Sequence, residues 1–367
     1  MKRYVPLGVA VLCLGGLGAL NCNQLRGGGG QGSSVRAPEF VGGAPDWINT
    51  TPLTLRSLRG RPVLVDFWEY TCVNCLRTLP YIAEWNRRYA GLGLVIVGIH
   101  TPEFRFSADR ANVEAAVKRL GIRYPVLLDN QRKNWSAYAN SFWPHHYLID
   151  AAGRIVYDHI GEGGYGETEQ AVQGVLREIN PSAKLPPLMA PVRPEDAPGA
   201  VCYPVTPELY AGYERGGLGS PEGYTRDTPA MYTDLPSGRE DGLLYAHGLW
   251  RAEREAMVHA RISADDYLAI RYHALGVNAV MRSAVMRSTD GRPLRVYLRQ
   301  DQAPLSREDA GEDVRFDGEG RAYVTVDAPR MYSLVKNRKF GYRVLQLSSV
   351  SDTLALYAFT FTSCTMQ

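Results

Sequence analysis

The chain has 367 residues, of which 45% are hydrophobic and 22% are charged, and its formal net charge at pH 7 is +3. This length favours two domains, each with room for a sizeable core, and the composition is that of an ordinary globular protein. The small and dispersed charge gives no indication of a nucleic-acid partner.

Residues 1–36 are predicted to be an export signal or anchor followed by a Gly-rich tether. Two basic residues precede an uncharged, mainly apolar run over residues 4–25, which has the shape of an export signal. A retained single span is the alternative, because the run is near the lower length limit for a transmembrane helix. Cys22 lies between this run and the flexible tether, an arrangement that resembles a bacterial lipoprotein acylation site. Lipidated, anchored and released forms would all place the rest of the chain outside the cytoplasm.

The central motif is a pair of cysteines, Cys72 and Cys75, at a predicted change from strand to helix. Residues 63–68 form an apolar run of strand length, and the apolar positions after Cys75 recur at helical spacing. A helix start presents N–H groups without acceptors and the positive end of the dipole, so it stabilises a thiolate at Cys72. Cys75, one turn later, is placed to resolve a mixed disulfide. The motif therefore predicts a dithiol–disulfide exchange centre.

Strands and helices alternate on both sides of this motif. The patterns predict strands over residues 52–55, 63–68, 94–99 and 124–128, helices over 109–120, 133–139 and 167–179 besides the cysteine helix, and a hairpin of 147–150 with 155–157. Such alternation indicates an α/β domain with a central mixed sheet flanked by helices, over residues 37–180.

A second domain of a different class is predicted beyond a linker. Residues 181–204 are rich in Pro and Ala, which is typical of a linker. Further on, alternating apolar runs separated by Gly and Asp turns predict an all-β antiparallel sandwich over residues 205–367. The nine runs cover residues 243–251, 256–262, 267–272, 277–281, 294–298, 322–326, 332–335, 342–347 and 354–361.

Two cysteines outside the central motif bracket the second domain. Cys202 and Cys364 would pair in an oxidising compartment, and two buried free thiols are the alternative. Closing a loop of this length stabilises a domain by at most ~5 kcal/mol in the chain-entropy model. We therefore expect a structural disulfide there.

Several motifs of the first domain together resemble the thioredoxin fold in its exported, TlpA-like branch. They are Asp66-Phe-Trp68, the Cys-x-x-Cys pair, a proline in the following helix, and Trp143-Pro144 before the hairpin. The similarity is closer still to the soluble C-terminal half of DipZ-type proteins, over roughly residues 40–365. This resemblance implies a thioredoxin-like domain followed by a β-sandwich similar to carbohydrate-binding modules. The motifs that carry it are residues 70–75, 98–103, 142–144, 147–150 and 161–165.

The resemblance implies roles for three further residues. Asp66 would be the buried acid beneath Cys75 that exchanges protons with the resolving thiol, with an ordinary strand-end aspartate as the alternative. Pro144 would be the cis-proline of the fold, facing the cysteine pair. The backbone of Trp143 would then pair with an extended substrate segment, with plain core packing as the alternative.

Two other groups of side chains are open to a functional or a structural interpretation. Alternation along a strand places His145 and His146 on opposite faces, where one of them could tune the thiolate or both could be simply packed or solvated. In the sandwich, an aromatic sugar platform and ordinary core packing are both compatible with Tyr224, Tyr232, Tyr245 and Trp250.

We expect an exported or anchored thiol–disulfide oxidoreductase that acts on protein disulfides, with reduction favoured because TlpA-like relatives mostly reduce. Its only redox group would be the Cys72–Cys75 disulfide. No metal is expected, because a zinc site needs two further ligands and no second pair has suitable spacing. DipZ-type proteins carry a membrane electron-transfer domain where this chain has a signal segment, so a separate membrane electron donor is implied. The sandwich would bind a carbohydrate or another envelope ligand.

Two other functions compete with this one. Peroxidases of the peroxiredoxin kind carry a Thr three residues before the reactive Cys. Here Glu69 precedes Cys72 by three and Cys72 itself precedes Cys75 by three, so neither cysteine fits. The other alternative is a non-enzymatic cell-surface binding protein in which the thioredoxin domain is only a scaffold.

Overall fold

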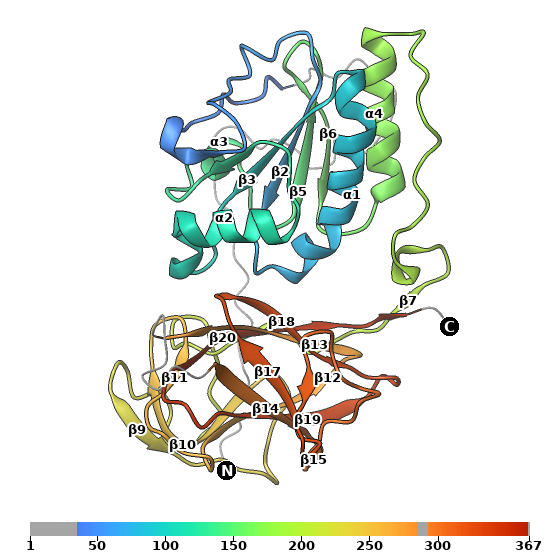
Figure 1. The fold of residues 1–367 in the computed structure, drawn as a ribbon. Coiled ribbons are helices and arrows are strands. Elements are labelled where there is room, and N and C mark those ends of the chain that lie inside the picture. The colour runs from blue at the N-terminus through green and yellow to red at the C-terminus, as the bar shows by residue number, and fades with distance from the viewer. Residues whose placement is uncertain (1–34, 285–292, 366–367) are drawn as a thin grey trace, which may run out of the picture. The chain divides into compact units, whose positions relative to one another are not determined.

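The computed structural model describes residues 35–284 and 293–365 (Figure 1). Almost all of the predicted export segment, including Cys22, therefore lies outside the described residues. Within the two described stretches, no helix is both long enough and apolar enough to cross a membrane.

The first domain is built on a six-stranded mixed sheet in the order β1-β4-β3-β2-β5-β6. The strands β2, β3 and β4 run parallel to one another, whereas the pairs β1–β4, β2–β5 and β5–β6 are antiparallel. Both β2 and β3 are buried along their whole length, as their continuous apolar sequences predict. The strands are β1 (Trp47–Ile48), β2 (Val63–Trp68), β3 (Val95–His100), β4 (Val126–Leu128), β5 (His145–Ile149) and β6 (Ile155–Ile160).

Helices cover both faces of this sheet. They are α1 (Val73–Tyr89), α2 (Arg110–Arg119), α3 (Lys133–Ala137) and α4 (Tyr165–Ile179). Residues Leu64 and Trp68 of β2 pack in one cluster with α1, α2 and α4, whereas Val65 and Phe67 pack on the opposite face, near α3. Helices α1 and α4 lie side by side along the sheet (Figure 1). The alternation along β2 therefore decides which of its residues face α1.

One predicted strand is wrong. Residues 52–55 are irregular and lead into a turn, and the edge strand of the sheet is instead β1, which pairs with β4. Thr54 and Ser57 hold this turn, because Ser57 Oγ donates to the Thr54 carbonyl at 2.8 Å and Ser57 N donates to Thr54 Oγ1 at 3.0 Å. Such local side-chain bonds compete with the pairing of a strand. The other predicted strands and helices of this domain are present, with ends shifted by a few residues.

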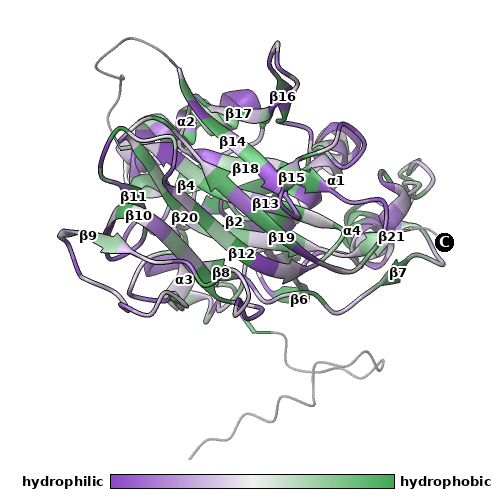
Figure 2. Cartoon of the chain, turned by 90° about the horizontal axis from the view of Figure 1, so that it is seen from below, coloured by the Kyte–Doolittle hydropathy of each residue, from purple (hydrophilic) through white to green (hydrophobic). Residues whose placement is uncertain are grey.

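The second domain is all-β, as predicted, and its strand pairs are antiparallel. Every one of the nine predicted runs contains a strand, and the hydrophobic character of these strands is evident along β20 (Figure 2). These nine are β10 (Leu244–Ala252), β11 (Met257–His259), β12 (Tyr267–His273), β13 (Gly276–Ser283), β14 (Leu294–Gln300), β17 (Ala322–Val326), β18 (Arg330–Lys336), β19 (Tyr342–Ser348) and β20 (Leu354–Thr362). Short strands that the patterns did not predict are β7 (Val201–Cys202), β8 (Leu209–Tyr210), β9 (Pro229–Tyr232), β15 (Ala303–Pro304), β16 (Arg315–Phe316) and β21 (Cys364–Thr365).

Strand β10 takes part in both layers of this domain. Its first half pairs with β12, and from Gly248 onward it pairs with β9 and β11. Gly248 has φ +94°, a left-handed conformation that residues with a side chain rarely adopt. Side chains from β12 and β14 in one layer and from β13 and β20 in the other form a single apolar core. Gly248 therefore marks the point where the chain passes from one layer of the sandwich to the other.

A disulfide joins Cys202 to Cys364 across a sequence separation of 162 residues. The two cysteines are directly opposite each other in a two-stranded antiparallel sheet formed by β7 and β21. We call the disulfide and the β7–β21 pair the clamp. Strand β7 lies within residues 181–204, so the predicted linker contains Cys202, one of the two cysteines of the clamp. The disulfide thus ties the end of the chain to the beginning of its second domain.

Replacing both cysteines, as Cys202→Ser with Cys364→Ser, should lower the free energy of unfolding of the second domain by up to ~5 kcal/mol, because the unfolded chain regains its loop entropy. Guanidinium unfolding of the oxidised protein measures this change, with Cys75→Ser as a control that leaves the clamp intact. Identical midpoints for the double variant and the control would show that the clamp does not stabilise the domain.

Candidate active site

Cys72 occupies the N-cap position of α1, directly after the turn that follows β2. Its backbone is extended, with φ −78° and ψ 116°, and the N–H of Cys75 donates a hydrogen bond to its sulfur at 3.2 Å. One of the N–H groups that a helix start leaves without an acceptor therefore points at this sulfur. The positive end of the helix dipole acts at the same place. The hydrogen bond and the dipole therefore both place positive electrostatic potential at this sulfur.

Cys75 lies in the first turn of α1 and is only 1% exposed, whereas Cys72 is partly exposed. Both are free thiols. Burial, followed by the hydrogen bond with Cys72 and by the charge of Cys72, raises the pKa of the Cys75 thiol well above its usual value. Cys72 is therefore the sulfur that a substrate can reach, and Cys75 needs a base before it can react.

The loop that carries Trp143 and Pro144 lies against the cysteine pair. The Trp143–Pro144 peptide bond is cis, and the sulfur of Cys72 is 4.0 Å from the Trp143 carbonyl oxygen. Strand β5 begins at the next residue and pairs with β2, with His145 opposite Phe67. The pairing of these two strands therefore brings the loop and the start of α1 to the same edge of the sheet.

The side chain of Trp143 forms part of an aromatic surface beside this loop. Its ring lies 4.4 Å from that of Trp135, and the guanidinium of Arg132 lies 5.3 Å from both rings, within the range of a cation–π contact. Phe142, next to it in sequence, is 52% exposed. A partly exposed sulfur beside a backbone carbonyl and apolar side chains is suited to an extended peptide segment.

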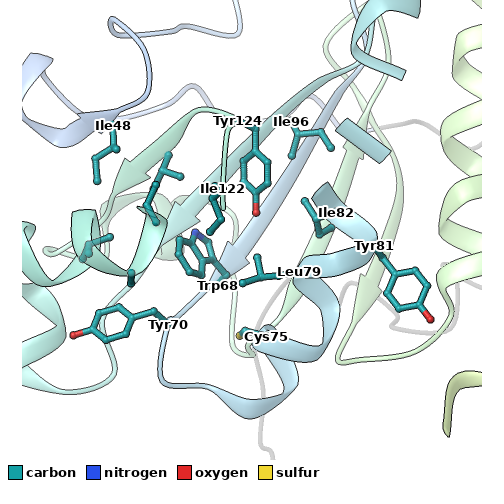
Figure 3. Packing of buried hydrophobic residues seen from close by; sticks show 14 of the residues in the cluster. Ile48, Trp68, Tyr70, Cys75, Leu79, Tyr81, Ile82, Ile96, Ile122 and Tyr124 are labelled. Carbon is teal, nitrogen blue, oxygen red and sulfur yellow. The ribbon is translucent and has the colours of Figure 1, made fainter. Parts of the chain in front are cut away.

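Asp66 is on the face of β2 that packs against α1, and it is 1% exposed. Its charge contributes to the raised pKa of Cys75 and, after burial, to the raised pKa of Tyr124. Figure 3 shows Cys75 and Trp68 close to the start of α1, with Tyr124 reaching towards them from the sheet side. The structure thus places the predicted acid in the buried layer beneath the resolving cysteine.

The two histidines after Pro144 have different surroundings because they lie on opposite faces of β5. His145 contacts Asn140 through Nδ1 at 2.5 Å and Asp158 through Nε2 at 3.0 Å. His146 faces the α1 side, where its Nδ1 lies 3.1 Å from Asp66 Oδ1. His145 is therefore held by its own partners, and His146 is the histidine that belongs to the layer beneath Cys75.

Sequence reasoning missed a second buried acid, Glu69, in the turn before Cys72. Its side chain is fully buried and accepts a hydrogen bond from Thr71 N at 2.6 Å, and His100 Nε2 lies 3.7 Å from its other oxygen. The ring of His100 stacks on Tyr70 at 5.4 Å. The only sequence signal that could have pointed to Glu69 is its place, as a single charged residue between an apolar strand and the cysteines. These contacts fix the turn that delivers Cys72 to the helix start.

The proposed aromatic platform of the sandwich is not an exposed surface. Tyr232, Tyr245 and Trp250 are almost completely buried, and Tyr224 packs against the same core. These side chains therefore form the interior of the second domain, as the alternative interpretation held.

No group of three or more His, Cys, Asp or Glu side chains within residues 35–284 and 293–365 is arranged to hold a metal ion. The expectation that Cys72 and Cys75 are the only redox group remains a prediction.

This fold and site define a thioredoxin-like protein with a Cys-x-x-Cys pair at a helix start. The family model described as Redoxin matches residues 33–176, and the model described as Thioredoxin like C-terminal domain matches residues 206–362. The protein DipZ of Mycobacterium tuberculosis is 35% identical over 256 residues, which cover 66% of this chain and 35% of DipZ. The chain thus spans about a third of the length of this relative.

Two further similarities concern the first domain. Thiol-disulfide oxidoreductase ResA of Bacillus anthracis is 30% identical over 142 residues, 38% of this chain and 77% of ResA. A crystal structure of a putative thiol:disulfide interchange protein DsbE from Chlorobium tepidum matches 39% of this chain and 96% of its own, with 21% identity and a TM-score of 0.35. With the ResA and DipZ matches, the chain belongs to the thioredoxin-like superfamily, in its TlpA/DipZ-like branch. The resemblance stated from the sequence is therefore confirmed.

Iodoacetamide at pH 7 should alkylate Cys72 of the reduced protein and leave Cys75 almost unmodified, because Cys75 is buried and its raised pKa keeps it protonated. Peptide mass mapping after a time course measures the two rates. In the Cys72→Ser variant the motif should take up almost no label. Similar rates at the two cysteines would contradict the assignment of Cys72 as the reactive sulfur.

Proposed function

We propose that the chain is an extracytoplasmic thiol–disulfide oxidoreductase that reduces disulfide bonds of other proteins through Cys72 and Cys75. The observation that supports it most directly is the hydrogen bond from Cys75 N–H to the partly exposed sulfur of Cys72. A sulfur that is stabilised as a thiolate and still reachable is what nucleophilic attack on a disulfide requires.

The first step joins the chain to its substrate. An extended segment of the substrate lies along the Trp143–Pro144 loop, which holds one of its sulfurs near Cys72. The Cys72 thiolate attacks that sulfur, a mixed disulfide forms, and the substrate's other sulfur leaves as a thiolate.

The second step releases the substrate. Asp66 accepts the proton of the Cys75 thiol, and the Cys75 thiolate attacks the sulfur of Cys72. The bond between Cys72 and the substrate breaks, and the substrate's second sulfur leaves as a thiolate. Two electrons have then passed to the substrate, and the chain carries a Cys72–Cys75 disulfide.

The direction, the location and the partners belong to the same proposal. Reduction is favoured because the chain resembles TlpA-like proteins, which mostly reduce. The N-terminal sequence and the Cys202–Cys364 disulfide favour a place outside the cytoplasm. No further cofactor is needed if a separate membrane protein supplies electrons through its own dithiol. The sandwich would dock an envelope ligand, either a carbohydrate or a protein.

Reduction of insulin by dithiothreitol tests the activity. The wild-type chain should accelerate it, and Cys72→Ser should reduce the acceleration to the uncatalysed level. Cys75→Ser should accumulate a mixed disulfide with insulin, because nothing resolves it. Equal acceleration by wild type and Cys72→Ser would support a scaffold role instead of an enzyme.

The direction is tested by two single-turnover reactions of the wild-type chain. If the chain is a reductant, the reduced form should transfer its electrons to a disulfide peptide almost completely, and the oxidised form should barely oxidise the matching dithiol peptide. The opposite balance would make the chain an oxidant.

A further inference from the structure

Three titratable side chains form a row across the sheet of the first domain. Asp66 of β2 is directly opposite His146 of β5, and His146 is directly opposite His159 of β6. Directly opposite residues of antiparallel strands project from the same face, with their Cβ atoms about 5 Å apart. Because β6 is an edge strand, the row leads from the centre of the sheet to its rim.

The inner part of the row is buried and lacks protein hydrogen bonds. His146 is 1% exposed, its Nδ1 lies 3.1 Å from Asp66 Oδ1, and its ring stands edge-on to that of Trp85. Among the described residues, neither ring nitrogen of His146 nor Nε2 of His159 has a hydrogen-bond partner. The two imidazoles are nearly parallel, at 17°, with centroids 6.4 Å apart. Buried polar atoms of this kind are normally satisfied by a bridging water.

The outer end of the row reaches the surface at the start of α4. His159 is partly exposed and lies against Gly164, where a Cβ atom would be 2.4 Å from His159 Cε1. Gly164 also has φ +57°, so both the backbone and the ring require glycine at this position. Gly164 and its neighbours Glu162 and Gly163 line a cavity of about 580 Å³ that is open to solvent. His159 therefore lies next to a residue that lines this open cavity, so a proton on its ring can pass to the solvent.

The second step of the exchange proposed above creates a need for such a path. Cys75 and Asp66 are each only 1% exposed, so a proton passed from one to the other cannot go directly to solvent. Burial, and then the neighbouring His146, lower the pKa of His159, so this ring is neutral near pH 7 and can take up and release a proton. The other titratable groups around the row are Tyr124 near Asp66, and Glu167 and His145 near His159. The backbone of Glu162 also hydrogen-bonds the His159 ring, which acts against this lowering of its pKa.

We propose that Asp66, His146 and His159 form a proton path from Cys75 to the surface, an inference that depends on the proposed exchange reaction. The Cys75 thiol gives its proton to the Asp66 carboxylate, and the resulting thiolate breaks the bond between Cys72 and the substrate. The proton then moves from Asp66 to His146, through one water to His159, and from His159 to solvent. The step balances: the Cys72–Cys75 bond forms as the bond between Cys72 and the substrate breaks, the substrate sulfur leaves as a thiolate, and the one proton released by Cys75 reaches the solvent. Neither histidine touches the substrate or the reacting sulfurs. Both act through Asp66, as positioning residues that carry its proton to the surface.

Ellman's reagent measures the two steps separately with the full chain. The reduced protein should release one thiolate from the reagent when Cys72 attacks and a second when Cys75 displaces it. The Cys72→Ser variant serves as the blank for thiols elsewhere in the chain. His146→Gln should slow the second release by about tenfold or more at pH 7 and leave the first unchanged, because only the second step needs a base.

A rescue experiment separates proton transfer from a structural role. His159→Gln should slow the second release in dilute buffer, and added imidazole should restore it, because a small base can replace a histidine at the surface. The matched control is His145→Gln, on the same strand but the opposite face, which should behave as wild type in both phases. Three results would each overturn the path. The first is a normal rate of the second release in both His146→Gln and His159→Gln. The second is a slow second release in His159→Gln that imidazole does not restore, and the third is an equally slow second release in His145→Gln.

Failure of this path is distinguishable from failure of the proposed function. Two thiolates from the wild type and one from Cys75→Ser establish the exchange reaction whatever the histidine variants do. One thiolate from the wild type would instead reject the exchange reaction itself.

Discussion

The contact on which the site depends is the hydrogen bond from the backbone of Cys75 to the sulfur of Cys72, at the point where β2 ends and α1 begins. A helix start has spare N–H groups, and here one of them is directed at a sulfur. The antiparallel pairing of β5 with β2 then sets the Trp143–Pro144 loop against the same sulfur. Cys72 and the Trp143–Pro144 loop are thus positioned by regular secondary structure, which holds them more rigidly than loops alone would.

The layer beneath this contact contains polar groups that an apolar core does not need. Asp66 and His146 are buried near each other, with nitrogen and oxygen atoms that lack hydrogen bonds within the described residues. An unpaired buried polar group costs about 1–3 kcal/mol, so such groups concentrate where they have a function. The second domain differs. Its buried Asp266 accepts hydrogen bonds from Arg261, Ser263 and the backbone of Leu249, which is the pattern of a structural carboxylate.

Periodicity and motif spacing were sufficient for most of the fold. The cysteine helix, the buried strands and all nine alternating runs of the sandwich could be read from local sequence, since each pattern is short and strong. Residues 52–55 were misread, because a turn held by Thr54 and Ser57 looks like a short strand when only apolar alternation is considered. The burial of Tyr245 and Trp250 depends on how the layers face each other, which local sequence does not determine.

The candidate site was only partly accessible to the same reasoning. Cys72 and Cys75 are recognisable from their spacing at a change from strand to helix, whereas Asp66 and Pro144 are recognisable only through the resemblance to the thioredoxin fold. The approach of His146 to Asp66, and the row that continues to His159, depends on strand register, which a single sequence leaves open. Glu69 and His100 meet for a similar reason, since Glu69 directly follows β2 and His100 ends the neighbouring parallel strand β3.

The most direct test of the account is the reduction potential of the Cys72–Cys75 couple, measured by equilibration with glutathione. A disulfide that serves a reductant should titrate as a single two-electron couple near about −270 mV, and the couple should vanish in Cys75→Ser. A potential near about −120 mV, which is typical of an oxidant, or the absence of any couple between the two sulfurs, would contradict the account.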